Sequence, residues 1–96
     1  MPRFDFIAAY MLANRKNGAL YAGATADLAA RMELHKAGRG SRFTAKYGCD
    51  RLVWFERFDE MAPAIACEKR LKRWPRRRKI DLIESINPHW DDLPIF

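Results

Sequence analysis

The pattern of residues 4–24 places the strongest constraint on the fold. Alternate positions of the first segment are apolar or aromatic, namely Phe4, Phe6, Ala8, Tyr10 and Leu12. A period of two is that of a β-strand, so we predict a strand over residues 4–13. A polar turn follows at residues 14–18 and ends in Asn17-Gly18, which is a strong hairpin signal. Residues 19–24 are then predicted to return as the second strand of an antiparallel hairpin.

The hairpin brings two tyrosines to one surface. For any even loop length, the period of two puts Tyr10 and Tyr21 on the same face of the sheet. They need not lie directly opposite each other. Two phenol groups on one face are therefore a candidate site, although tyrosines on a strand also serve simply to pack a core or an edge.

A helix is predicted to follow the hairpin. Thr25 or Asp27 can cap its start, and it should run to about residue 36 before the glycines of residues 38–40 end it. Arg31 and His35 fall on or beside the inward apolar stripe of this helix. A purely structural helix usually has Leu or Ala at such positions, so two chargeable residues directed towards the sheet are informative.

The second half of the chain is predicted to contain another strand followed by helices. Residues 41–48 are predicted to form a short helix or an ordered loop, and the apolar segment 51–58 a third strand. The next helix opens at Asp59 and has an apolar stripe, with Glu68 at its margin: Ala64, Cys67, Leu71 and Trp74. After Pro75, a fourth helix covers about residues 76–86, and Asn87-Pro88 stops it.

These elements predict an α/β (α+β) fold, in which a small three-stranded antiparallel sheet is flanked by helices. The predicted order is two strands, a helix, a short helix, a strand and two helices. A length of 96 residues fits one domain, spanning residues 1–96. No apolar run approaches the roughly 18 residues that a membrane-spanning helix requires. Cys49 and Cys67 have no zinc-site spacing, and we interpret them as reduced thiols in a cytoplasmic protein.

The charge of the chain indicates the kind of partner. There are 18 Lys and Arg residues against 12 Asp and Glu, which gives a net charge of +6 and a pI of about 9.7. Such an excess favours a polyanion, either nucleic acid or an anionic membrane surface. The chain lacks a terminal amphipathic anchor, so nucleic acid is the better interpretation. A basic protein with no polyanionic partner is the alternative.

The candidate site residues are those that phosphodiester hydrolysis requires: Tyr10, Tyr21, Arg31, His35 and Glu68. The reaction needs a base for water, a cation for the charge of the transition state, and a metal that polarises the phosphate. One carboxylate is enough for Mg²⁺ when water and substrate phosphate supply the other ligands. Each residue also has a structural interpretation. In particular, Glu68 could pair with Lys72 one helical turn later.

Several short motifs resemble those of the GIY-YIG endonuclease family, in the family's order and over residues 4–93. The first is Ala8-Ala9-Tyr10 and the second Tyr21-Ala22-Gly23. Residues 25–35 are similar to the helix with the catalytic Arg, and residues 38–44 to the basic loop of small stand-alone members. Residues 68–74 match the segment with the metal-ligand Glu, and residues 87–93 the closing motif. Each motif is loose by itself, but their order and spacing together are specific.

The resemblance implies a role for each residue. Tyr10 and Tyr21 would contact the attacking water, with Tyr21 the preferred base, and Arg31 would bind the scissile phosphate. His35 stands where some relatives, including the excision-repair incision nucleases, have tyrosine. Glu68 would bind Mg²⁺ or Mn²⁺. The predicted nucleic-acid contacts are Arg39, Arg42, Lys46, Lys69, Lys72 and Asn87.

Some positions depart from the family pattern. Ala8 and Ala9 replace the Gly and Ile of the first motif, and Ala22 the Ile of the second, but both tyrosines remain. Ala24 stands where the incision nucleases often have a lysine, which removes one phosphate contact. The leading hypothesis is thus a metal-dependent endonuclease that cleaves DNA, in a process such as repair or recombination. The alternative is a nucleic-acid-binding module of the same fold that cleaves little.

Overall fold

The computed structural model of the chain describes residues 6–95 and has a three-stranded antiparallel sheet at its centre. Its strands are β1 (Ala8–Ala13), β2 (Leu20–Thr25) and β3 (Arg51–Arg57), in the spatial order β2-β1-β3. The predicted hairpin and third strand are confirmed. Phe6 forms only an isolated bridge, with Asp27, and residues 4 and 5 of the predicted first strand lie outside the described residues.

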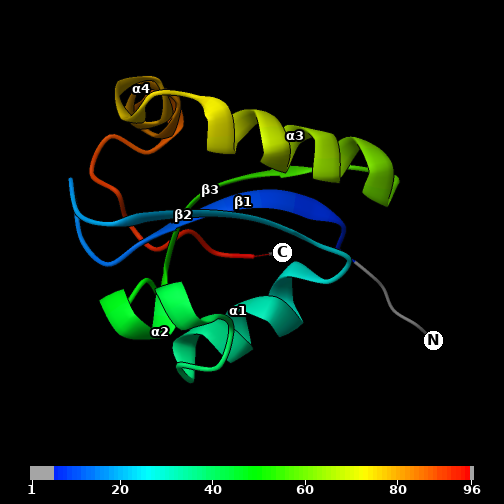
Figure 1. Cartoon of the computed structure of the whole chain (residues 1–96), viewed down its shortest axis with the longest axis horizontal. Coiled ribbons are helices and arrows are strands. Elements are labelled where there is room, and N and C mark those ends of the chain that lie inside the picture. Colours follow the sequence, from blue (N-terminus) through cyan, green and yellow to red (C-terminus); the bar gives the residue numbers. More distant parts are fainter. Residues whose placement is uncertain (1–5, 96) are drawn as a thin grey trace.

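Four helices form two layers, one on each face of the sheet (Figure 1). The short helices α1 (Leu28–Lys36) and α2 (Arg42–Tyr47) lie below the sheet in this view, and α3 (Met61–Arg73) and α4 (Arg76–Ile86) lie above it. This α+β arrangement has the predicted order of elements. Within the described residues, no helix is long and apolar enough to cross a membrane.

Local capping explains where the helices begin and end. The Asp27 carboxylate accepts a hydrogen bond from the Ala30 amide at the start of α1, and the Ser41 hydroxyl accepts one from the Thr44 amide at the start of α2. Gly48 ends α2 with φ at +66°, a conformation that favours glycine because it has no Cβ. Pro75 separates α3 from α4 at the N-cap of the second helix, where its missing N–H costs nothing.

Strand β1 is buried on both faces because it is the central strand between two helical layers. Ala9, Met11 and Ala13 pack on the α3–α4 side, in a cluster that includes Trp54 and Leu71. The alternate residues pack on the other side, in a second cluster: Ala8, Tyr10, Leu12, Leu28, Met32, Cys49 and Leu52. Tyr10 therefore belongs to the α1–α2 layer, whereas the stripe of α3 belongs to the opposite layer.

The β1–β2 turn is held by contacts from within the turn and from α4. Asn17 has φ at +60°, and the Asn14 side chain accepts a hydrogen bond of 2.9 Å from the Ala19 amide. The Arg76 guanidinium donates to the carbonyl oxygens of Asn17 and Gly18, at 3.0 and 2.6 Å. The first residue of α4 is thus tied to the hairpin turn.

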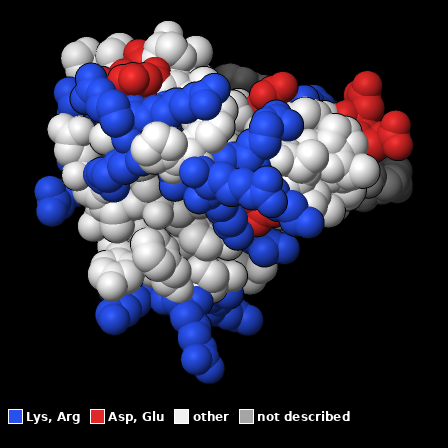
Figure 2. All heavy atoms as spheres, turned by 45° about the horizontal axis from the view of Figure 1, so that its top comes forward, with Lys and Arg blue, Asp and Glu red and all other residues white. Residues whose placement is uncertain are grey.

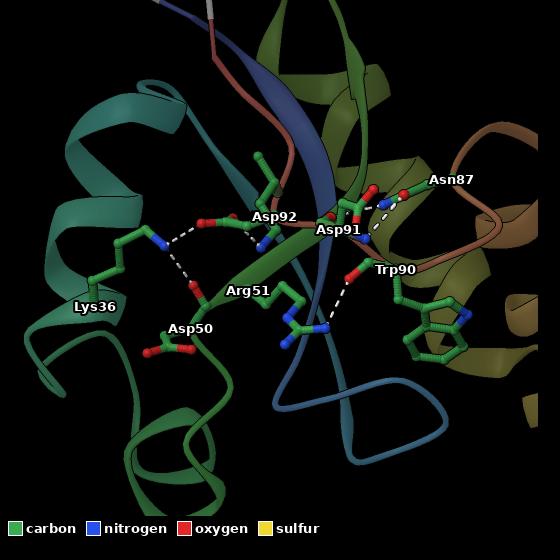
Figure 3. Close-up of polar contacts among 8 residues, drawn as sticks. Lys36, Asp50, Arg51, Asn87, Trp90, Asp91 and Asp92 are labelled. Atoms are coloured by element: carbon green, nitrogen blue, oxygen red, sulfur yellow. Dashed lines mark hydrogen bonds and ion pairs between the residues drawn. The ribbon is translucent and has the colours of Figure 1, made fainter.

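The C-terminal tail covers the outer edge of β3 (Figure 3). The Leu52 amide donates to Asp92 Oδ1, and the Leu93 amide donates to the Leu52 carbonyl, each at 2.8 Å. The second carboxylate oxygen of Asp92 accepts a hydrogen bond of 2.7 Å from Lys36 Nζ on α1. An open edge strand is a template for unwanted pairing, and the tail satisfies these groups of the edge within the chain.

We expect Asp92→Ala to lower the free energy of unfolding by about 1–2 kcal/mol, because the Leu52 amide loses a charged acceptor. Urea denaturation of the parent and variant measures this difference. Asp81→Ala is the matched control, since it breaks only the exposed Arg77–Asp81 pair of α4 and should cost less than about 0.5 kcal/mol. Equal losses in the two variants would show that the tail does not stabilise the fold.

Candidate active site

Tyr10 and Tyr21 lie on the same face of the sheet, which confirms the prediction from the sequence. Tyr10 is opposite Gly23 in the β1–β2 register, and Tyr21 is opposite Leu12. The two rings are neighbours, with their centroids 6.3 Å apart. A Cβ atom at Gly23 would come within 2.6 Å of the Tyr10 hydroxyl. Glycine at this position of the second motif therefore makes room for the Tyr10 ring.

His35 extends this cluster from α1. Its ring is buried, and its centroid lies 5.8 Å from that of Tyr10 and 5.6 Å from that of Tyr21. His35 Nε2 is 3.0 Å from the Tyr10 hydroxyl, and His35 Nδ1 is 3.1 Å from the Thr44 hydroxyl of α2. A side chain at Gly40 would collide with the His35 ring, so the loop before α2 can only pass at this distance with glycine.

His35 lies in a chain of hydrogen bonds whose direction depends on its tautomer. A neutral imidazole donates through one nitrogen and accepts through the other, so Tyr10 and Thr44 take opposite roles towards the ring. The Thr44 hydroxyl also lies 3.3 Å from the Ser41 carbonyl oxygen and 2.9 Å from the Ser41 hydroxyl. With Nδ1 protonated, Thr44 accepts from His35 and the Tyr10 hydroxyl donates to Nε2.

The ionisation of Tyr10 and His35 reflects burial and the charges around them. Burial raises the pKa of Tyr10 well above its ordinary value, with smaller contributions in the same direction from Tyr21 and Glu68. Arg31 acts in the opposite direction on Tyr10. Burial also lowers the pKa of His35, and the positive charge of Arg31 lowers it further. Tyr10 is thus a neutral phenol and His35 a neutral imidazole near pH 7.

Arg31 and Tyr21 contribute two further polar groups to this cluster. Arg31 on α1 and Tyr21 on β2 are each partly buried. Across residues 6–95, no side-chain hydrogen bond or ion pair engages the Arg31 guanidinium or the Tyr21 hydroxyl. Among these residues, a guanidinium that no carboxylate neutralises and a phenol without a hydrogen-bond partner therefore each lie near the buried Tyr10–His35 pair.

Glu68 approaches the cluster from the opposite helical layer. It lies on α3, which packs against β2 and β1, and its charge acts on Tyr10. The carboxylate is 19% exposed and forms an ion pair of 2.8 Å with Lys72. This is the pairing that the sequence left open as the alternative for Glu68. Hydrogen bonding to Glu68 raises the pKa of Lys72, and Tyr21 contributes in the same direction.

The Glu68 carboxylate suits a hard cation. Carboxylate oxygens are ligands of the kind that Mg²⁺ and Mn²⁺ take. In the part of the chain that the structure describes, no group of three or more His, Cys, Asp or Glu side chains could hold a metal by itself. A divalent ion held here would therefore depend on water and substrate phosphate for most of its ligands.

Basic side chains surround the cluster on both layers. Figure 2 shows Lys and Arg gathered over the side of α3 and α4, with a second group projecting at the lower edge of the view. The predicted nucleic-acid contacts on these elements are all exposed: Arg39, Arg42, Lys46, Lys69 and Lys72.

Asn87 does not belong with the exposed basic residues. It is buried, and its side-chain amide donates to the carbonyl oxygens of Val53 and Asp91, at 3.1 and 2.8 Å. Its own oxygen accepts from the Asp91 amide at 3.0 Å. These bonds fix the tail against β3, and we therefore leave Asn87 out of the nucleic-acid surface.

Sequence reasoning missed two contributors from α2. Thr44 orients His35, and the Phe43 ring stacks on Tyr21 with centroids 6.1 Å apart. The only local signal was the capping pattern of Ser41 and Thr44, which predicts a helix start but not its neighbours.

The model of the GIY-YIG catalytic domain matches residues 6–81 of this chain. The chain belongs to the GIY-YIG family. Its relatives include the UPF0213 protein of Lacticaseibacillus paracasei, 32% identical over 74 residues, which cover 77% of this chain and 83% of the relative. The UPF0213 protein of Bacillus pumilus is 36% identical over 70 residues, covering 73% and 71% of the two chains.

A solved structure shows the same fold. The solution NMR structure of a UPF0213 protein from Bacillus halodurans superimposes with a TM-score of 0.56 at 29% identity, and the match covers 91% of this chain and 92% of the other. GIY-YIG domains are of nuclease type, act on nucleic acid and generally use divalent metals. The UPF0213 names of the relatives state no activity.

We expect the GIY-YIG domain to lose stability as the pH falls, in part through His35. The pKa of His35 is lowered in the folded protein, so as the pH falls through the ordinary histidine pKa of about 6.5 the unfolded chain binds a proton before the folded one does. The free energy of unfolding therefore decreases over this range, as urea denaturation can measure. His35→Gln should flatten the decrease, whereas His89→Gln, which removes an exposed histidine, should retain it. Parallel curves for the parent and His35→Gln would contradict the assignment.

Proposed function

We propose that this GIY-YIG domain is a metal-dependent endonuclease that hydrolyses phosphodiester bonds in DNA. The observation that carries the proposal is the cluster in which an Arg31 guanidinium and a Tyr21 hydroxyl, both without a side-chain partner among residues 6–95, adjoin the Tyr10–His35 pair. Cys49 and Cys67 are buried free thiols, which supports a reducing, cytoplasmic setting.

Arg31 is the proposed ligand of the scissile phosphate. Its guanidinium can donate two parallel hydrogen bonds to phosphate oxygens, a geometry that suits the phosphorane-like transition state. Its partial burial strengthens this interaction because fewer water molecules compete for the same oxygens. No carboxylate within residues 6–95 has to release Arg31 before it can bind.

Tyr21 is the proposed group that contacts and deprotonates the attacking water. Its hydroxyl has no hydrogen-bond partner among residues 6–95, and the Lys72 ammonium lies within electrostatic range of it. A nearby cation stabilises a phenolate, which is the form that can accept a proton. Tyr10 suits the task less well because burial keeps it neutral. It can instead orient the water through its hydroxyl, which is also hydrogen-bonded to His35.

Glu68 is the proposed protein ligand of Mg²⁺ or Mn²⁺. A bound divalent ion would polarise the phosphate and stabilise the leaving oxygen. For Glu68 to bind it, the ion pair with Lys72 has to loosen, which frees Lys72 to contact a phosphate. The exposed residues Arg39, Arg42, Lys46 and Lys69 would contact the neighbouring backbone phosphates.

The Glu68–Lys72 pair also supports the second candidate function, a nucleic-acid-binding module that cleaves little. If the pair persists in the complex, the carboxylate is not available to a metal, and the basic surface still binds. The endonuclease needs Arg31 and Glu68 for cleavage, whereas the binding module does not. Mutation of these two residues therefore distinguishes the two functions.

We expect Arg31→Ala to reduce the cleavage rate on the order of 10²- to 10³-fold, the scale for the loss of one donor to a transition state. Single-turnover cleavage of labelled duplex, nicked, flap and single-stranded DNA with Mg²⁺ or Mn²⁺ is the assay. Arg77→Ala is the control, because that exposed residue of α4 lies in the opposite layer and should leave the rate unchanged. An unaltered rate in folded Arg31→Ala would exclude Arg31 from the mechanism.

Glu68→Gln should abolish metal-dependent cleavage and weaken Mn²⁺ binding, while DNA still binds in the absence of metal. Calorimetric titration of Mn²⁺ into each protein, with a non-cleavable DNA present, measures the affinity. Lys72→Met is the matched variant, since it breaks the same ion pair but retains the carboxylate and should keep Mn²⁺ binding. If Glu68→Gln binds Mn²⁺ and cleaves like the parent, Glu68 only pairs with Lys72.

A further inference from the structure

A row of aromatic rings leads from the proposed active site to the protein surface. The Phe43 ring stacks on that of Tyr21 with an interplanar angle of 29°. Tyr47 continues the row from Phe43, with centroids 4.8 Å apart. Phe43 and Tyr47 are 41% and 45% exposed, whereas Tyr10 at the inner end is buried.

Core packing does not account for the outer two rings. Phe43 and Tyr47 are four residues apart and therefore share one face of α2, while α2 is anchored to the fold through its buried residue Thr44. Residues 6–95 expose only five large hydrophobic side chains above a third of their surface: Leu34, Phe43, Tyr47, Ile65 and Ile86. Phe43 and Tyr47 are in direct contact, and adjoining exposed apolar groups commonly mark a binding surface.

The charges around the row indicate its ligand. Residues 37–49 contain Arg39, Arg42 and Lys46 but no acidic residue. Lys46 Nζ lies 5.3 Å from the centre of the Tyr47 ring. An exposed aromatic face beside basic side chains matches the two parts of a nucleotide, its planar base and its anionic phosphate.

We propose that Phe43 and Tyr47 form a stacking subsite for one unpaired nucleobase, which flanks the phosphate held by Arg31. This inference rests on the proposed function and adds a substrate class to it. Inside a continuous duplex both faces of each base are covered by its neighbours, so a base that covers these rings has to be unpaired or at an end of the duplex. The preferred substrates are therefore single strands, gaps and unpaired ends rather than continuous duplexes.

The test is binding of fluorescein-labelled oligonucleotides in EDTA, followed by anisotropy, with a single strand compared with a fully paired, blunt-ended duplex of the same length. The parent should bind the single strand more tightly. Phe43→Leu and Tyr47→Leu should each weaken single-strand binding on the order of 10-fold and change duplex binding little. The salt dependence of single-strand binding should keep its slope, because neither change removes a charge.

Control variants separate stacking from other effects. Phe43→Trp retains a π face and should restore single-strand binding, and Ile86→Ala removes an exposed apolar side chain of α4 and should have no effect. If the parent binds nucleic acid but Phe43→Leu and Tyr47→Leu bind the single strand as tightly, the subsite is refuted and the proposed function stands. If the parent binds no nucleic acid, both are refuted.

A second copy of this chain could instead cover the Phe43 and Tyr47 rings. Sedimentation of the parent protein without nucleic acid tests this alternative. We expect a monomer at the concentrations used for binding. A dimer that dissociates in Phe43→Leu would assign the rings to self-association and would overturn the subsite.

Discussion

The buried hydrogen bond between Tyr10 and His35 is the interaction on which the site depends. It joins the central strand β1 to α1, and the bond from His35 to Thr44 extends the chain to α2. Each partner is a polar group withdrawn from water, so breaking any one of these bonds leaves the next group unsatisfied at a cost of about 1–3 kcal/mol. The same bonds fix the orientation of the two rings, while burial keeps both neutral near pH 7.

The fold could be predicted in large part because its signals are local. The alternation of residues 4–13 and the cap at Asp27 act within a few residues, and the structure has a strand at Ala8–Ala13 and a helix that begins after Asp27. The shared face of Tyr10 and Tyr21 followed from the period of a strand alone. The burial of both faces of β1 could not be predicted in this way, because the small residues Ala9 and Ala13 do not distinguish a covered face from an exposed one.

The site was less accessible to sequence reasoning wherever a contact joins distant elements. A helical stripe shows which side of α3 meets the sheet, but it cannot show which face of the sheet α3 covers. Glu68 therefore proved to lie in the layer opposite Arg31, and its ion pair with Lys72 is formed. Asn87 shows the same limit. Its place in a motif suggested an exposed contact to nucleic acid, whereas its side-chain amide is buried and holds the tail on β3.

The hairpin turn helps to determine which helical layer each side chain of β2 faces. Because successive residues of β2 face opposite layers, a slip of one residue would send Tyr21 towards α3 and bring Ala22 to the side of His35. Arg76 donates to the carbonyl oxygens of Asn17 and Gly18, so the start of α4 opposes such a slip at the turn that precedes β2. The face on which the Tyr21 phenol lies is thus held in part from the opposite layer, and an insertion of one residue in the turn would direct Tyr21 away from Tyr10 and His35.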